Sequence, residues 1–138
     1  MENFKFYLPL QVRYGDLDPQ GHVNNAHTVT FIEQGRFAYL CQLGLWDGHS
    51  FLDLPMIVAD VHVVYLAPIF FNQEIRVAVR VTRIGNKSIT FEHQLEDSQT
   101  GQVTTRAEVV MVFYDYHTNT SRPVSAEWRE KISAFENL

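Results

Sequence analysis

The sequence predicts an α+β protein in which a five-stranded antiparallel sheet wraps around one long central helix. Residues 25–43 carry apolar side chains on more than one side of a helical period, so this helix should be enclosed rather than lie on a surface. Residues 4–14 form an apolar extended segment, and four later segments follow the two-residue period of strands. One helix with a long sheet favours a layered arrangement in which the helix covers one face.

The four later strands are expected to run as a meander. They should cover residues 58–66, 74–84, 88–96 and 103–116. The first of them blurs the two-residue period, which is typical of a strand buried on both faces. Between the second and the third, Gly85-Asn86 predicts a hairpin turn with left-handed residues.

The ends of the helices also have sequence signals. Gly44 predicts the end of the long helix. Ser125 is the expected cap of a short amphipathic helix that closes the chain, with Trp128, Ile132 and Phe135 as its buried stripe. No repeat, low-complexity tract or linker interrupts the chain, so residues 1–138 are expected to form a single domain.

Composition and charge limit the classes of function. The chain is 46% hydrophobic and carries a net charge of −5, which argues against nucleic acid as the main partner because phosphate binding needs a broad basic surface. Cys41 is the single cysteine, and its apolar neighbours predict a buried thiol. The longest apolar run, residues 63–71, is far too short to span a bilayer, and the N-terminus lacks the apolar stretch of a secretory signal. We therefore expect a soluble cytoplasmic protein.

The segment YGDLDPQGHVNN, residues 14–25, concentrates the chemistry of the chain. Asp18 and His22 flank a turn containing Pro and Gly, and Asn24 and Asn25 are natural caps for the helix that follows. An acid, an imidazole and free backbone N–H groups should therefore meet at a helix start. Such a place suits negative charge that develops on a reacting carbonyl oxygen.

The pattern V-R-Y-x-D-x-D-x-x-G-H-V-N-N, followed by a helix with E-x-x-R, resembles the hotdog-fold acyl-CoA thioesterases. The most similar branch is the 4-hydroxybenzoyl-CoA thioesterase-like group. Residues 64–68 and 83–88 look like the second strand and the hairpin of this family, so the similarity covers nearly the whole chain. The resemblance implies a hotdog fold and the hydrolysis of an acyl-CoA thioester to a carboxylic acid and free coenzyme A.

The resemblance also implies that Asp18 is the catalytic carboxylate, either as nucleophile or as general base. His22 matches a histidine of the family and is the second candidate, either for contact with substrate or water or for holding the loop. Similar plant enzymes have D-x-N-x-H here, whereas this chain has the longer amide of Gln20 at the middle position. Asp16 is the weaker catalytic candidate, and we expect it to brace the turn through Arg13.

Thioester hydrolysis requires donors for the oxyanion. The N–H groups of His22, Val23 and Asn24 are free if the helix begins at Asn25, and Gly21 would allow a close approach of the substrate. The expected oxyanion and positioning residues are Gln20, Gly21, Val23 and Asn24, with Asn25 as the helix cap. The helix dipole should keep Asp18 ionised.

Other charged pairs have structural explanations. Glu33 and Arg36 lie three apart and can pair across one helical turn. Asp60 and His62 share one face of a strand, but no further His or Cys completes a ligand set nearby. We therefore expect no metal site and no metal or redox cofactor.

The coenzyme A part and the acyl group of the substrate would each need their own contacts with the protein. Arg83, Lys87 and Ser88, at the predicted hairpin, are placed to meet the phosphates of coenzyme A. Apolar and aromatic residues near the long helix should line the acyl pocket. These residues are Phe31, Tyr39, Trp46, Phe51 and Met56.

A wrapped sheet leaves exposed edge strands, and pairing two sheets edge to edge removes one edge from each. The resemblance implies the same homodimer, or a homotetramer, with sites at the interface. Two alternatives stay open: a non-hydrolytic module that binds acyl thioesters, and an acyl-carrier-protein thioesterase.

Overall fold

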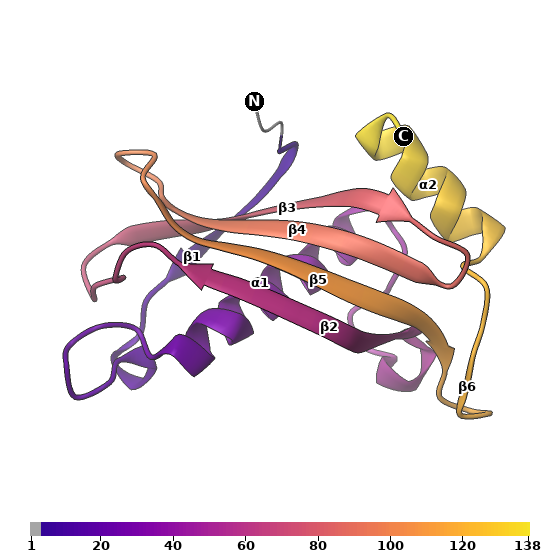
Figure 1. The fold of residues 1–138 in the computed structure, drawn as a ribbon, viewed down its shortest axis with the longest axis horizontal. Coiled ribbons are helices and arrows are strands. Elements are labelled where there is room, and N and C mark those ends of the chain that lie inside the picture. Colours follow the sequence, from indigo (N-terminus) through magenta and orange to yellow (C-terminus); the bar gives the residue numbers. More distant parts are fainter. Residues whose placement is uncertain (1–3) are drawn as a thin grey trace.

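The computed structural model describes residues 4–138 and contains two α-helices against one antiparallel sheet (Figure 1). The helices are α1 (Asn25–Gln42) and α2 (Ala126–Glu136), with short 3-10 turns at Tyr14–Asp16 and Phe51–Asp53. The strands are β1 (Phe6–Gln11), β2 (Met56–Tyr65), β3 (Glu74–Ile84), β4 (Ser88–Asp97), β5 (Val103–Asp115) and the two-residue β6 (Thr120–Ser121). The predicted helices and strands are confirmed to within a few residues at their ends.

The order of the strands differs from the predicted meander. The sheet runs β1-β3-β4-β5-β2, and β6 pairs with the end of β5. Tight hairpins join β3 to β4 and β4 to β5, whereas β1 pairs with the free side of β3, from Phe6 opposite Val79 to Gln11 opposite Glu74. Because β1 occupies that side, β2 pairs instead with β5 at the other edge of the sheet.

The position of β2 contradicts the prediction that residues 58–66 are buried on both faces. β2 is the last strand of the sheet and has a neighbour on one side only, so most of its residues are exposed. Its exposed apolar residues include Val58 and Val61, both 44% exposed, and Tyr65 at 49%. The apolar pattern therefore belongs to an edge strand.

α1 covers one face of the sheet and contacts β1, β3 and β4. Asn24 is the N-cap, because its side chain accepts a hydrogen bond from the Ala26 N–H at 2.8 Å; the prediction that Asn25 caps the helix was wrong, since Asn25 is the first helical residue. The predicted end is confirmed: Gly44 has φ +72°, and the Leu45 N–H returns to the Leu40 carbonyl at 2.9 Å.

The buried face of α1 is set by close packing on the sheet. A Cβ on Gly35 would lie 2.5 Å from Val77 Cγ1, so only glycine allows this approach of helix to β3. Tyr39 and Leu40 are fully buried, but Cys41 is exposed. The predicted buried thiol was wrong because one residue turns a helix by about 100°, which directs Cys41 away from the sheet.

α2 has the predicted cap and stripe. The Ser125 side chain accepts a hydrogen bond from the Trp128 N–H, Trp128 and Ile132 are buried, and Phe135 is half-buried. Neither helix within residues 4–138 is long and apolar enough to cross a membrane.

The turn between β3 and β4 forms without left-handed residues at Gly85 or Asn86, contrary to the prediction. A Cβ at position 85 would lie 2.6 Å from Ser88 Oγ, so a larger residue there would require the Ser88 side chain to rotate.

Candidate active site

A cleft of about 520 Å³ lies between the motif loop, the start of α1 and the end of β2. In Figure 1 this loop is the indigo segment beyond the N-terminal end of α1, near the arrowhead of β2. The lining residues are Asp18, Gln20, His22, Val23, Asn25, Thr28, Tyr65, Leu66, Ala67, Pro68, Ile69 and Thr105. The structure therefore brings Asp18, Gln20, His22 and Val23 into one cleft, as the motif predicted.

Asp16 is the brace of the motif loop. It is 1% exposed, and its carboxylate accepts hydrogen bonds from the Arg13 N–H at 2.8 Å and from His27 Nδ1 at 3.0 Å. Burial alone would raise the pKa of Asp16, but the hydrogen bonds from Arg13 and His27 hold that pKa below its ordinary value. The structural role predicted for Asp16 is confirmed, and the prediction of Arg13 as its partner is confirmed as well.

Asp18 closes the tight turn, and one of its carboxylate oxygens has no hydrogen-bond partner within the described residues 4–138. Its backbone N–H donates to the His22 carbonyl at 2.8 Å, and the Gly21 N–H, at a residue with φ +83°, donates to the Asp18 carbonyl at 3.0 Å. Asp18 Oδ1 accepts from the N–H groups of Gln20 at 2.9 Å and His22 at 3.4 Å. Asp18 Oδ2 takes part in none of these bonds, so the side chain is held by one oxygen at the cleft wall.

His22 is fixed by the segment that follows β2. It forms an isolated β-bridge with Phe70, and the two rings meet edge to face with centroids 5.3 Å apart. The Val23 N–H donates to the Ile69 carbonyl at 2.8 Å. Residues 66–69 therefore form one wall of the cleft, and Ile69 and Phe70 hold the histidine loop against it.

The predicted oxyanion donors are not free. The N–H groups of Val23 and Asn24 donate to the carbonyls of Ile69 and Asp16, both at 2.8 Å, and the His22 N–H faces Asp18. The Asn25 N–H, by contrast, has no acceptor among residues 4–138, and Asn25 lines the cleft. A free N–H group is thus found later in the chain than predicted, because the N–H groups of Val23 and Asn24 are already bonded before the first helical residue.

Three polar lining residues, and the apolar residues 66–69, were missed by sequence reasoning. The Tyr65 hydroxyl donates to the Asn25 carbonyl at 2.9 Å and so ties the end of β2 to the start of α1. Thr28 follows Asn25 by three residues, which is one helical turn, and Thr105 lies opposite Tyr65 on β5. Helical spacing from Asn25 could have indicated Thr28, whereas Thr105 depends on strand pairing that the sequence does not display.

The predicted coenzyme A residues lie at the other end of the chain's own sheet. Ser88 pairs with Val112, seven residues along β5 from the cleft residue Thr105. At about 3.3 Å per residue this is a distance of roughly 23 Å. Lys87 Nζ donates to Ser121 Oγ at 3.3 Å, and Arg83 is exposed. A single chain therefore does not bring Arg83, Lys87 and Ser88 to Asp18.

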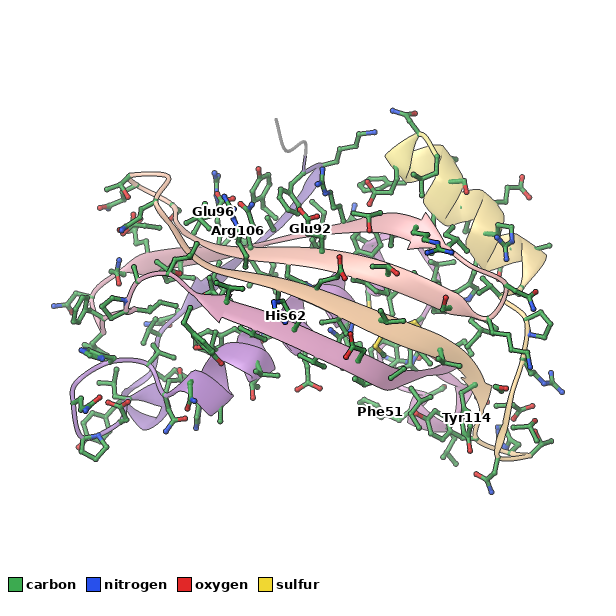
Figure 2. The ribbon with its side chains drawn as sticks, viewed as in Figure 1. Phe51, His62, Glu92, Glu96, Arg106 and Tyr114 are labelled. Atoms are coloured by element: carbon green, nitrogen blue, oxygen red, sulfur yellow. The ribbon has the colours of Figure 1, made fainter. Side chains whose placement is uncertain are left out.

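The residues predicted for the acyl pocket also lie outside the cleft. Phe31, Tyr39 and Met56 belong to the core, where the Tyr39 hydroxyl donates to Glu136 Oε2 at 2.6 Å. Trp46 and Phe51 meet edge to face at 5.1 Å, and Phe51 is 66% exposed. Figure 2 shows Phe51 and Tyr114 at the end of the sheet away from the motif loop. The single chain does not assemble these residues around Asp18.

Glu33 and Arg36 form the predicted pair, with 4.0 Å between Oε2 and Nη2, but away from the cleft. Arg36 is 1% exposed, and its Nε and Nη1 atoms lack a hydrogen-bond partner among residues 4–138, as do both ring nitrogens of the buried His93. Burial lowers the pKa of Arg36 to about 10, although Glu33 opposes this shift. Arg36 and His93 are therefore buried polar side chains with unsatisfied nitrogen atoms.

No group of three or more His, Cys, Asp or Glu side chains within residues 4–138 could hold a metal ion. His62, Glu92 and Arg106, which Figure 2 labels, line a hollow of about 200 Å³. The absence of a metal or redox cofactor stays a prediction.

Residues 12–134 match the sequence profile of the thioesterase-like superfamily. The chain belongs to this superfamily. A thioesterase from Thermus thermophilus, solved with coenzyme A and zinc, is 30% identical to the chain and superposes with a TM-score of 0.87 over 100% of this chain and 98% of its own. The long-chain acyl-CoA thioesterase FadM of Escherichia coli is 24% identical over 123 residues, which is 89% of this chain and 93% of FadM.

A further solved structure has a likeness that concerns the fold alone. The 1,4-dihydroxy-2-naphthoyl-CoA thioesterase Slr0204 from Synechocystis has a TM-score of 0.82 at 16% identity, over 92% of this chain and 94% of its own. The family match and these relatives confirm the resemblance drawn from the motif, and the protein is a thioester hydrolase.

Proposed function

We propose that this thioesterase-superfamily protein is a cytoplasmic acyl-CoA thioesterase with a single hotdog domain, in which the antiparallel sheet wraps around α1. The observation that carries the proposal is the cleft in which Asp18, with Oδ2 unengaged, lies with His22 and the free N–H of Asn25. The carbon–sulfur bond breaks after oxygen adds to the thioester carbonyl. The products are a carboxylic acid and the free thiol of coenzyme A.

Asp18 supplies the attacking oxygen or activates it. As a general base, its carboxylate takes a proton from a water molecule that adds to the carbonyl; as a nucleophile, it adds directly, and water then hydrolyses the mixed anhydride. Either course leaves negative charge on the carbonyl oxygen. The Asn25 N–H at the start of α1 is the donor we assign to that charge, in place of the N–H groups of Val23 and Asn24. His22 contacts the substrate or the water from the same cleft wall.

Coenzyme A contacts are proposed to come from a second copy of the chain. β2 is an edge strand with exposed apolar residues, and antiparallel pairing of two such edges would extend the sheet across a homodimer. The Met56 end of one β2 would then lie beside the Tyr65 end of the other. The hairpin with Arg83, Lys87 and Ser88, at the Met56 end of its own sheet, would thereby approach the partner's cleft.

The mass of this assembly can be measured directly. Light scattering of the purified protein is expected to give twice the 16.0 kDa of the chain, or four times that mass for a homotetramer. An active particle of 16.0 kDa would contradict a site shared between copies.

Thiol release from a panel of acyl-CoA esters tests the proposed reaction. Short, long, branched and aryl esters are each mixed with the wild-type protein while the free thiol is monitored, with acyl-carrier-protein esters as competitors. We expect release of one thiol per acid formed, with faster turnover of the CoA esters. Binding without thiol release would instead identify a non-hydrolytic acyl-thioester module. Preference for the protein carrier would identify an acyl-carrier-protein thioesterase.

A further inference from the structure

Two threonine side chains in the cleft are buried yet lie beside the proposed catalytic residues. Thr28 of α1 is 3% exposed and Thr105 of β5 is 1% exposed, and both line the cleft with Asp18 and His22. They come from opposite sides of the cleft interior, one from the helix and one from the sheet. Thr28 and Thr105 are thus the most buried polar residues that line this cleft.

The hydrogen bonds of both hydroxyls are long. Thr28 Oγ1 reaches the Asn24 carbonyl at 3.4 Å, and Thr105 Oγ1 lies 3.5 Å from Thr104 Oγ1. Thr104 already donates its proton to the Leu95 carbonyl at 3.1 Å, so it can only accept from Thr105. Hydroxyl hydrogen bonds are ordinarily about 2.7–2.8 Å long, and buried hydroxyls are ordinarily well bonded. Thr28 and Thr105 therefore retain unused hydrogen-bonding capacity inside the cleft.

A threonine hydroxyl is better suited to bind a water molecule than to stabilise only an oxyanion. The Asn25 N–H can only donate, whereas a threonine hydroxyl both donates and accepts, and a bound water needs about two to four polar partners. Thr28 lies one turn after Asn25, so the two residues lie on the same side of α1, and both line the cleft. Asp18 Oδ2 supplies an acceptor at the same cleft.

We propose that Thr28 and Thr105 are positioning residues that hold the hydrolytic water of this cleft for Asp18. The inference rests on the proposed thioesterase activity and adds the water-holding partners to it. The water donates a proton to Asp18 and is oriented by the two hydroxyls while its oxygen adds to the thioester carbon. If Asp18 attacks directly, the same hydroxyls orient the water that cleaves the anhydride.

The test compares variants that keep the shape with variants that keep the hydroxyl. Thr28→Val and Thr105→Val retain the branched side chain, and Thr28→Ser and Thr105→Ser retain the hydroxyl. We expect each valine variant to lower kcat about 10- to 100-fold with little change in KM, and each serine variant to stay within a few-fold of the wild type. Thr30→Val, on the exposed side of α1, is the matched control and should keep the wild-type rate.

Added hydroxylamine provides a second measurement, the ratio of hydrolysis to hydroxamate formation, which a change in packing alone would not alter. It attacks the thioester without the held water and forms a hydroxamate, so the valine variants should lose hydrolysis more than hydroxamate formation. Where a valine variant does not fold, Ser and Ala at that position make the same comparison.

Valine variants with wild-type kcat, or serine variants as slow as valine ones, would overturn the inference. If the wild type hydrolyses CoA esters and Asp18→Asn does not, that outcome leaves the proposed function standing. Absence of thiol release from the wild type would overturn both.

Discussion

Replacing Asp18 with asparagine is expected to lower thioester turnover by about 100-fold or more. The amide keeps the size of the side chain and can still accept the N–H groups of Gln20 and His22, so the turn should survive. It carries no negative charge, however, and neither takes a proton from water nor adds to the carbonyl. The loss should therefore appear in kcat, measured by thiol release from the best ester of the panel.

Asp47→Asn is the matched control for this substitution. Asp47 also accepts two backbone N–H groups of its own loop, from His49 at 2.7 Å and Ser50 at 2.8 Å, but it lies outside the cleft. Its variant should hydrolyse at the wild-type rate. Equal rates for Asp18→Asn and the wild type would move the catalytic role to another residue. Thermal unfolding of Asp18→Asn at the wild-type temperature would show that a lower rate is not a folding defect.

The second large effect is expected in stability, at mildly acidic pH. His93 is fully buried on β4 without a partner for either nitrogen, and its burial, followed by the positive charge of Arg36, holds its pKa well below the ordinary value. The unfolded chain therefore binds a proton at His93 below about pH 6.5 while the folded chain does not. Stability should fall with pH by about 1.4 kcal/mol per unit below that point. The slope applies over the pH range in which the folded His93 stays neutral, and each unit is about a tenth to a quarter of the roughly 5–15 kcal/mol typical of a domain.

Denaturant unfolding from about pH 7 to about pH 4.5 measures this slope. His93→Leu, which fills a similar volume, should flatten it, and the exposed His49→Gln should leave it unchanged.

The depressed pKa of Asp16 acts in a different pH range, since its contribution to stability is lost only below about pH 3.9. The exposed pair of His117 with Asp53 raises the pKa of His117 and so acts with the opposite sign. A wild-type protein with equal stability at about pH 7 and about pH 5 would contradict the role of His93.

Local patterns predicted the elements of the fold well. α1 and α2 follow helical spacing, with Gly44 and Ser125 at the predicted ends, and β3 and β4 follow the two-residue period. The position of β2 was missed because strand order depends on which edges remain free, and β1 had taken the free side of β3. The apolar character of both faces of β2 is equally compatible with a central strand and with an edge that pairs outside the chain.

The candidate site was predicted only where its residues are close together in the sequence. Asp16, Asp18 and His22 lie within one loop, so their spacing in the sequence determined their proximity in space. The free donor was missed because the Val23 N–H is taken by Ile69, a residue distant in sequence. Thr105 likewise enters the cleft through the pairing of β5 with β2. The residues predicted to line the acyl pocket do not surround Asp18 in the single chain, because aromatic composition does not distinguish core residues from those that line a tunnel.

A crystal structure with a non-hydrolysable acyl-CoA analogue, in which a methylene separates sulfur from the carbonyl, would show where the reacting group binds. We expect the ligand carbonyl oxygen to lie about 3 Å from the Asn25 nitrogen, with the Asp18 carboxylate beside the carbonyl carbon. A carbonyl bound outside this cleft, with both Asp18 oxygens bonded to their own loop, would contradict it.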